Sequence, residues 1–152
     1  MDLLVFGTLM DADILAAILG RRLSPAHMEA ATIFDVRRVF VPRRPYPMLI
    51  RHPGTKIDGL LLRGLGLRDL ARLDRYEGQE YRRIRSARTA AMTVRDRNAR
   101  TRPVWLYVHK MAEKTKSRDW HFTAWRSLHK TATLARLTGP RIPSAAAAAA
   151  LS

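Results

Sequence analysis

The first twenty residues follow a pattern of apolar and polar positions that is typical of a strand followed by a helix. Leu3 to Phe6 form a short apolar run, which predicts a buried strand that leads directly into a turn at Gly7-Thr8. Asp11 suits an N-cap and Gly20 suits a C-terminal stop, so residues 12–19 predict a helix. Its apolar stripe consists of Ile14, Leu15, Ile18 and Leu19.

Later segments have the composition of strands. Residues 29–41 are rich in β-branched and aromatic side chains, which predicts one bent strand or two short ones. Four prolines between positions 42 and 53 predict an irregular loop around the short run MLI, and residues 57–65 predict the next strand. Residues 81–96 and 102–110 predict a long strand and its partner, joined by a turn near Arg97-Asn98.

Two further helices complete the pattern. Residues 67–78 predict a helix that ends at Gly78, with Leu67, Leu70 and Leu73 on its buried face. Residues 118–138 predict a last helix, with Trp120, Trp125, Leu128 and Leu137 partly on one face. The order of these elements is not a regular βαβ alternation, so the sequence predicts an α+β domain with a strongly bent, barrel-like sheet. We expect this domain to span residues 1–139 and a Pro/Ala-rich tail to span residues 140–152.

Length and composition are those of one folded domain of 152 residues, with 47% apolar and 27% charged residues. The chain has no cysteine, which excludes disulfides, thiolate metal sites and cysteine nucleophiles. Asp2 stands where a signal peptide carries basic residues, and no apolar run reaches the length of a membrane span. The sequence therefore predicts a soluble, cytoplasmic protein.

The charge is strongly positive. Lysine and arginine total 28 against 13 acidic residues, a formal net charge of +15, which makes nucleic acid a possible partner. The basic residues are scattered instead of forming one run with interleaved aromatics, so we rank nucleic-acid binding below an enzymatic function. The five histidines show neither an HExxH motif nor a close ligand spacing, so we assign no metal and no cofactor.

Glu77 is the most informative polar position. It follows Leu70 by seven residues and therefore lies on the apolar face of its helix, in the last turn before Gly78. Desolvation and the negative end of the helix dipole both disfavour the charged carboxylate, which would make Glu77 a poised proton acceptor. Periodicity alone favours the alternative, in which Glu77 extends past the helix end to Arg82 or Arg83.

Two segments together resemble the gamma-glutamylcyclotransferase-like family. That family pairs a Y-G-T-L or Y-G-S turn with a later L-D-x-[FY]-E-G-x-x-Y-x-R segment. Here the two parts are Phe6-Gly7-Thr8-Leu9 and LDRYEGQEYR at residues 73–82. PVWLYVH at residues 103–109 and the last helix resemble the closing elements of the family, so the resemblance covers about residues 3–137. It implies an α+β fold around a small mixed-strand β-barrel with flanking helices.

The resemblance also implies a reaction without metal or cofactor. The α-amine of a γ-glutamyl group attacks its own γ-carbonyl, which gives 5-oxoproline and a free amine. The resemblance assigns Glu77 as the acid/base and places the glutamyl group at Phe6, Gly7, Thr8 and Leu9, where backbone N–H groups hold it. Tyr81 is a further candidate for the cavity wall, as is Tyr107, although a strand tyrosine is more often a packing residue. The family turn usually begins with tyrosine, and Phe6 lacks that phenol.

Other readings remain open at this point. One is a weakly catalytic or non-catalytic family member whose basic surface binds nucleic acid or an acidic partner. Another is an acyl- or amine-transferring relative that uses the same cavity. Four arginines beside the proline-rich segment are candidates for attracting a substrate carboxylate, although a solvated basic surface is the simpler explanation: Arg37, Arg38, Arg43 and Arg44. Asp74 is expected to pair with an arginine.

Overall fold

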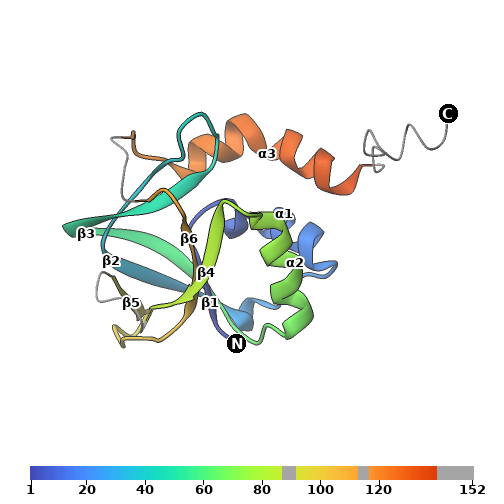
Figure 1. The fold of residues 1–152 in the computed structure, drawn as a ribbon. Helices are drawn as coiled ribbons and strands as arrows, with labels where there is room; N and C mark the ends of the chain where they lie inside the picture. Colours follow the sequence, from blue (N-terminus) through green and yellow to red (C-terminus); the bar gives the residue numbers. More distant parts are fainter. Residues whose placement is uncertain (87–91, 113–116, 140–152) are drawn as a thin grey trace.

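The strand β1 (Leu3–Val5) lies inside a six-stranded sheet, and all three of its residues are buried (Figure 1). The computed structural model describes residues 1–86, 92–112 and 117–139, and within them the strand order is β4-β6-β1-β3-β2-β5. β1 pairs in parallel with β6 (Trp105–His109) and antiparallel with β3 (Pro47–Leu62). The short apolar run at the amino terminus is therefore a buried strand, as predicted.

The remaining pairs are antiparallel. β2 (Met28–Phe40) pairs with β3 on one side and with β5 (Thr93–Asp96) on the other, while β4 (Tyr81–Arg85) pairs with β6. The mixed sheet with its helices confirms the predicted α+β class. Among the described residues, β4 and β5 are two edges that do not pair with each other, so the barrel-like sheet is open on one side.

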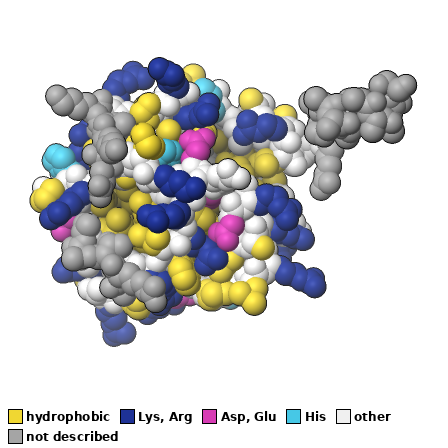
Figure 2. Space-filling model, viewed as in Figure 1, with side chains coloured by type: hydrophobic (Ala, Val, Ile, Leu, Met, Phe, Trp, Pro, Cys, Tyr) yellow, Lys and Arg dark blue, Asp and Glu magenta, His cyan; other side chains and the backbone are white. Residues whose placement is uncertain are grey.

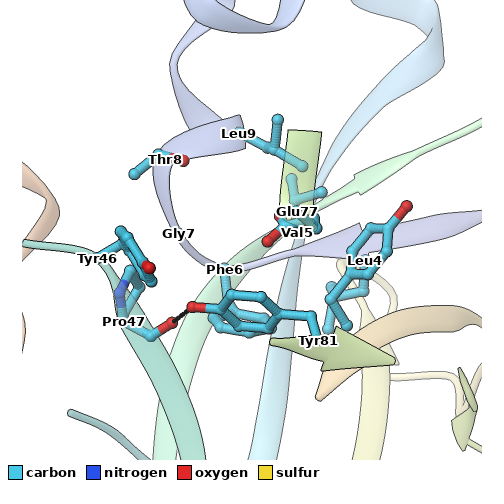
Figure 3. Close-up of a pocket in the computed structure, with 11 residues that line it drawn as sticks. Leu4, Val5, Phe6, Gly7, Thr8, Leu9, Tyr46, Pro47, Glu77 and Tyr81 are labelled. Atoms are coloured by element: carbon cyan, nitrogen blue, oxygen red, sulfur yellow. Dashed lines mark hydrogen bonds between the residues drawn. The ribbon is translucent and has the colours of Figure 1, made fainter. Parts of the chain in front are cut away.

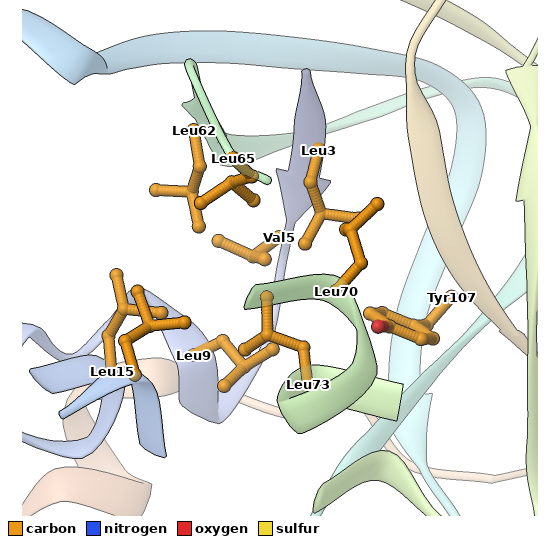
Figure 4. Close-up of a cluster of buried hydrophobic side chains, with 10 residues drawn as sticks. Leu3, Val5, Leu9, Leu15, Leu62, Leu65, Leu70, Leu73 and Tyr107 are labelled. Atoms are coloured by element: carbon orange, nitrogen blue, oxygen red, sulfur yellow. The ribbon is translucent and has the colours of Figure 1, made fainter. Parts of the chain in front are cut away.

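Side chains alternate across β1 and fill two cores. Leu3 and Val5 contact the helices that cover one face of the sheet, in the cluster drawn in Figure 4. Leu4, on the opposite face, belongs to a cluster formed by residues of the strands and adjoining segments, including Ile33 and Leu106. Because helices contribute nothing to this second cluster, the sheet has to curve around it.

The helix α1 (Ala12–Leu19) has the limits that its sequence signals predict. The Asp11 carboxylate accepts hydrogen bonds from the N–H groups of Asp13 and Ile14, and Gly20 ends the helix with a φ of 74°. A short 3-10 helix, η2 (Pro25–His27), then leads into β2.

The helix α2 (Leu67–Glu77) packs Leu70 and Leu73 against the sheet, but Leu67 is 78% exposed, contrary to the prediction. An α-helix turns by about 100° per residue, so Leu67 and Leu73 point about 120° apart. Glu77, by contrast, lies only about 20° from Leu70 around the helix axis. The buried face of α2 thus runs from Leu70 and Leu73 to Glu77.

β3 is the largest departure from the predicted elements. The sequence predicts a loop up to Pro53 and a separate strand over residues 57–65, whereas β3 is continuous from Pro47 to Leu62. Pro53 lies where the register with β2 shifts: residues 52–55 of β3 bulge opposite the single residue Asp35, whose φ is 64°. Because the ladder is interrupted there, the missing N–H of a proline removes no pairing hydrogen bond.

The segment 81–96, predicted as one long strand, contains two strands at opposite edges of the sheet. β4 pairs with β6, whereas β5 pairs with β2, and a turn follows β5 at Arg97-Asn98 as predicted. Strand-forming side chains continue through both strands, and nothing in their order shows that the partner strand changes between them.

The helix α3 (Phe122–Thr138) starts four residues later than predicted. Trp120 precedes it, is buried, and donates a hydrogen bond from Nε1 to the carbonyl of Pro45, while Leu128 is 75% exposed and lies off the buried face. Trp120 and Trp125 pack on Ile14 of α1. Within the described part of the chain, no helix is long and apolar enough to cross a membrane. The predicted tail, residues 140–152, lies outside the described residues, so the domain boundary stays a prediction.

Candidate active site

The turn after β1 brings the backbone of Gly7 against β3. Gly7 precedes the 3-10 helix η1 (Thr8–Met10), and a Cβ at position 7 would lie 2.9 Å from Cγ of Pro47. Contacts this short do not occur between a Cβ and a ring carbon, so a larger residue would push the turn away from Pro47. The strand runs into a glycine here because only a glycine allows this close approach.

The same turn leaves backbone donors available. The first N–H groups of a helix have no acceptor within the helix. In the described part of the chain, the amides of Thr8 and Leu9 make none of the loop or turn hydrogen bonds, and no side chain caps the turn at Gly7. These amides are therefore free to donate to a ligand oxygen in the adjoining pocket.

Glu77 lies across that pocket from the turn. Figure 3 shows its carboxyl group facing the space between the Gly7–Leu9 segment and the Tyr46–Pro47 segment. The structure excludes the alternative in which Glu77 pairs with an arginine, because Arg83 binds Asp74 instead, at 2.9 Å. Within residues 1–86, 92–112 and 117–139, no side chain forms an ion pair with Glu77.

The environment of Glu77 favours its protonated form. Glu77 is partly exposed as a whole residue, yet desolvation by the surrounding protein and, as the smaller cause, the nearby Asp74 carboxylate together raise the pKa of its carboxyl group to about 8. A carboxyl group with a pKa near neutrality can both accept and return a proton at physiological pH.

The pocket at Glu77 has a volume of about 330 Å³, including open solvent, and is lined by every residue that the sequence assigns to the site. The candidates Phe6, Gly7, Thr8, Leu9 and Tyr81 all line it together with Glu77. Tyr107 lines it as well. The two segments of the sequence motif, some seventy residues apart, therefore meet in one cavity.

Two tyrosines of the pocket wall, Tyr81 and Tyr107, donate hydrogen bonds from their hydroxyl groups to other groups of the protein. Tyr81 donates to the carbonyl of Pro47 at 2.6 Å, and Tyr107 donates to Asp74 at 2.6 Å. Burial raises the pKa of both phenols. Both residues therefore line the cavity and also pack within the protein, as the sequence considerations allowed.

Some residues around Glu77 were not identified from the sequence as part of the site, among them Tyr46 and Pro47 of the inner pocket and Tyr76, which lines a neighbouring pocket. Tyr46 and Pro47 reach the pocket because β3 passes beside the turn, and this depends on a tertiary contact that no local pattern encodes. Tyr76 shares a hydrogen bond of 2.8 Å with Thr8 and so ties α2 to the turn. Its place beside Glu77 in the sequence motif was the available signal.

The four candidate arginines have different partners. Arg37 pairs with Asp119 at 2.6 Å. Arg38 donates to the carbonyl of Phe6 at 2.9 Å and lies over the ring of Trp120, so it supports the turn. Arg43 is exposed and lines neither pocket near Glu77, whereas Arg44 lines the larger of the two.

This larger outer pocket adjoins the first. It has a volume of about 1190 Å³, including open solvent, and it shares Thr8, Tyr46, Glu77 and Tyr81 with the inner pocket. Its far wall is a face of α3. In the described ranges of the chain, no group of three or more His, Asp or Glu residues is arranged to hold a metal ion.

Comparison with known proteins agrees with this geometry. The model of the family "Gamma-glutamyl cyclotransferase, AIG2-like" matches residues 3–126. AIG2-like protein A from Arabidopsis thaliana is 27% identical over 131 residues, which cover 85% of this chain and 74% of that protein.

Solved structures have the same fold. A solution structure of a protein from Arabidopsis thaliana matches with a TM-score of 0.65 and 22% identity, over 86% of this chain and 75% of that one. A structure of a gamma-glutamyl cyclotransferase matches with a TM-score of 0.51 and 9% identity, over 95% of this chain and 90% of that one. At these identities the likeness concerns the fold, and it confirms the predicted architecture.

Proposed function

We propose that this chain, which belongs to the gamma-glutamyl cyclotransferase, AIG2-like family, cyclises a γ-glutamyl amine or amino acid to 5-oxoproline and releases the free amine. The observation that carries the proposal is Glu77, a desolvated carboxyl group with a pKa of about 8 at a pocket that faces the Gly7–Leu9 turn. Family membership and the cyclotransferase-like fold support the reaction class.

The reaction is a ring closure within the substrate. The α-nitrogen attacks the γ-carbonyl carbon, the new C–N bond closes a five-membered lactam, and the original bond to the leaving nitrogen breaks. Between the two ammonium forms, the attacking nitrogen gives up two protons and the leaving nitrogen gains two. The Glu77 carboxyl group has a pKa of about 8, so it can accept protons from the attacking nitrogen and return them to the leaving nitrogen.

The turn supplies the electrostatic part of the proposed mechanism. Negative charge develops on the carbonyl oxygen as the amine attacks, and the N–H groups of Thr8 and Leu9 are donors without an acceptor in the described loops and turns. The inner pocket also holds the glutamyl chain in a folded shape, which brings the reacting atoms together. Phe6, Gly7 and Tyr81 act as walls of this binding site.

A substrate panel tests the proposed function. Purified protein is incubated with several γ-glutamyl amines and γ-glutamyl amino acids, and 5-oxoproline is measured by mass spectrometry. Matched α-glutamyl compounds serve as controls, because their amide is at the α-carbonyl and cannot give this ring closure. We expect release of 5-oxoproline from γ-glutamyl compounds only. If none of them is cyclised, the proposed function is wrong.

A further inference from the structure

The outer pocket continues from the site at which the reaction is proposed to occur. It shares Thr8, Tyr46, Glu77 and Tyr81 with the inner pocket, and it extends from there to α3. If the glutamyl group fills the inner pocket, the atoms beyond the scissile bond enter the outer one. The outer pocket is therefore the place for the leaving amine.

One face of α3 forms the far wall of this pocket. The residues involved recur at helical spacing, at positions i, i+4, i+7, i+8 and i+11: Trp125, His129, Ala132, Thr133 and Arg136. Lys130, on another face, binds Asp11 at 2.9 Å and Asp13 at 2.7 Å on the α1 side. These ion pairs fix the rotation of α3 about its axis, so that the face with the five pocket residues is turned toward Glu77.

Two cationic side chains line this pocket, those of Arg44 and Arg136. Among the described lining residues, the carboxyl groups are those of Glu77 and Glu80. Glu80 already accepts hydrogen bonds from Tyr46 at 2.8 Å and from His109 at 3.2 Å, and Arg44 lies 3.6 Å from it.

Arg136 forms no ion pair with any residue of the described ranges. A guanidinium group of this kind offers paired donors that match a carboxylate. A cationic leaving amine, such as a polyamine, would instead meet the like charge of Arg136, while the charge of Arg44 on the other side is partly offset by Glu80.

We infer that the outer pocket binds the leaving amine and selects one that carries a carboxylate, with Arg44 and Arg136 as the specificity-determining residues. This inference rests on the proposed function, because it takes the glutamyl group to be in the inner pocket. It narrows the substrate to γ-glutamyl amino acids or peptides, as opposed to γ-glutamyl conjugates of neutral or cationic amines.

Three substrates that differ at one group test the inference. γ-Glutamyl-alanine carries the carboxylate, γ-glutamyl-ethylamine is the same compound without it, and γ-glutamyl-ethylenediamine carries a cation in its place. We expect kcat/KM to fall by roughly tenfold or more from the first compound to the second, as for the loss of a charge-assisted hydrogen bond, and to be lowest for the third.

Arginine variants locate the preference. Arg136→Gln and Arg44→Gln should each lower kcat/KM for γ-glutamyl-alanine and leave γ-glutamyl-ethylamine nearly unchanged. Arg68→Gln removes the same charge from the exposed first turn of α2, at the opposite end of that helix from Glu77, and should change neither substrate. An arginine in the last turn of α3 also complements the helix dipole, so thermal stability is measured for each variant. A purely stabilising role would not change the ratio between the two substrates.

Each other outcome has a definite meaning. Equal turnover of the alanine and ethylamine compounds, or a preference that survives in both arginine variants, overturns the inference and leaves the proposed function intact. If the wild-type protein cyclises neither these two compounds nor any other γ-glutamyl compound of the substrate panel, the proposed function fails. Calorimetric binding of the same two compounds then decides the inference. Tighter binding of the alanine compound that depends on Arg136 supports it, whereas equal or absent binding overturns it.

Discussion

Two carboxyl groups on α2, one turn apart, have opposite environments. Asp74 accepts hydrogen bonds from Arg83 and Tyr107; burial alone would raise the pKa of this carboxyl group, but these partners outweigh it and lower the pKa. Glu77 has no such partner among the residues that the structure describes, and desolvation is the main cause that raises its pKa to about 8. The same helix thus holds one carboxylate as a structural ion and presents the other as a proton acceptor. The difference between them comes from the groups that surround each carboxyl group.

Most carboxylates at the protein surface, like Asp74, lie close to a cationic side chain. Figure 2 shows lysine and arginine side chains spread over the visible face instead of gathered in one patch. With 28 basic residues in the chain, most carboxylates have a cation close by, as the ion pairs of Asp13, Glu29 and Asp119 illustrate. Asp35, Asp58 and Asp96 also form no ion pair within the described residues, so what distinguishes Glu77 is that a missing ion pair is combined with a raised pKa.

The largest expected effect is on turnover in Glu77→Gln. Glutamine keeps the size and shape of the side chain but cannot accept a proton, so cyclisation should fall by roughly 100-fold or more, the usual contribution of a positioned general base. Asp69→Asn neutralises a carboxylate in the first turn of the same helix and is the control. Circular dichroism confirms that both variants fold, and release of 5-oxoproline is the measurement. Near wild-type turnover in folded Glu77→Gln would remove the catalytic assignment.

The next effect concerns stability as a function of pH. Because the folded protein raises the pKa of Glu77 from 4.5 to about 8, the protonated carboxyl group is favoured on folding. Its contribution is complete below about pH 4.5 and is lost as the pH rises to about 8. Glutamine does not titrate, so Glu77→Gln should gain stability relative to wild type across this window, on the order of a few kcal/mol.

Chemical denaturation at a series of pH values measures this gain. Glu80→Gln is the matched control, because hydrogen bonds from Tyr46 and His109 lower the pKa of Glu80. The stability that Glu80 contributes is lost as the pH falls, so this variant should deviate from wild type in the opposite direction. If the free energy of unfolding of Glu77→Gln changes with pH in the same way as that of wild type, Glu77 is solvated in the folded protein.

A smaller effect is expected from Asp74→Asn. The Asp74 carboxylate is the second cause of the raised pKa of Glu77, after desolvation, so its neutralisation should lower that pKa. A general base must be deprotonated, so kcat/KM should increase with pH as Glu77 ionises, and in Asp74→Asn this increase should occur at a lower pH. Arg83 loses its partner in a partly exposed ion pair, which should cost about 1 kcal/mol or less. A pH–rate profile of the variant checks the shift. If kcat/KM of the variant increases at the same pH as in wild type, or at a higher pH, the two carboxyl groups are not coupled.

The smallest effect is expected from Phe6→Tyr. Phe6 is buried at the wall of the inner pocket, and the variant adds the phenol that the family turn usually carries. One additional hydrogen bond contributes about 0.5–1.5 kcal/mol, so kcat/KM should change by no more than roughly tenfold. Steady-state kinetics with the best γ-glutamyl substrate provide the comparison. A much larger increase would mean that the missing phenol, and not Glu77, limits the reaction.

Local signals in the sequence were sufficient where a structure depends on neighbouring residues. Asp11 and Gly20 define α1 because a cap and a left-handed stop act within a few residues. Glu77 was placed on the buried face of α2 by the helical repeat alone. The sequence failed for β3, because the strand continues past Pro53 only by bulging, with residues 52–55 opposite Asp35 of β2, and that partner is distant in the chain.

The site was predictable to a similar extent. The turn and Glu77 came from the motif, and the structure brings them to one pocket. Tyr46 and Pro47 were missed because they reach that pocket through the pairing of β3 in the sheet. The absence of a cation at Glu77 was also beyond the sequence. Arg83 is six residues away and available by spacing, and only the fold shows that Asp74 takes it.

A direct titration of the carboxyl groups by carbon-13 NMR tests the central contrast between Glu77 and Asp74. In the wild-type protein we expect one glutamate carboxyl signal to titrate near pH 8 and to be absent from Glu77→Gln, while the Asp74 signal titrates below the ordinary aspartate value of 3.8. If every glutamate titrates close to the ordinary value of 4.5, Glu77 is a solvated surface carboxylate and the proposed acid–base role has no physical basis.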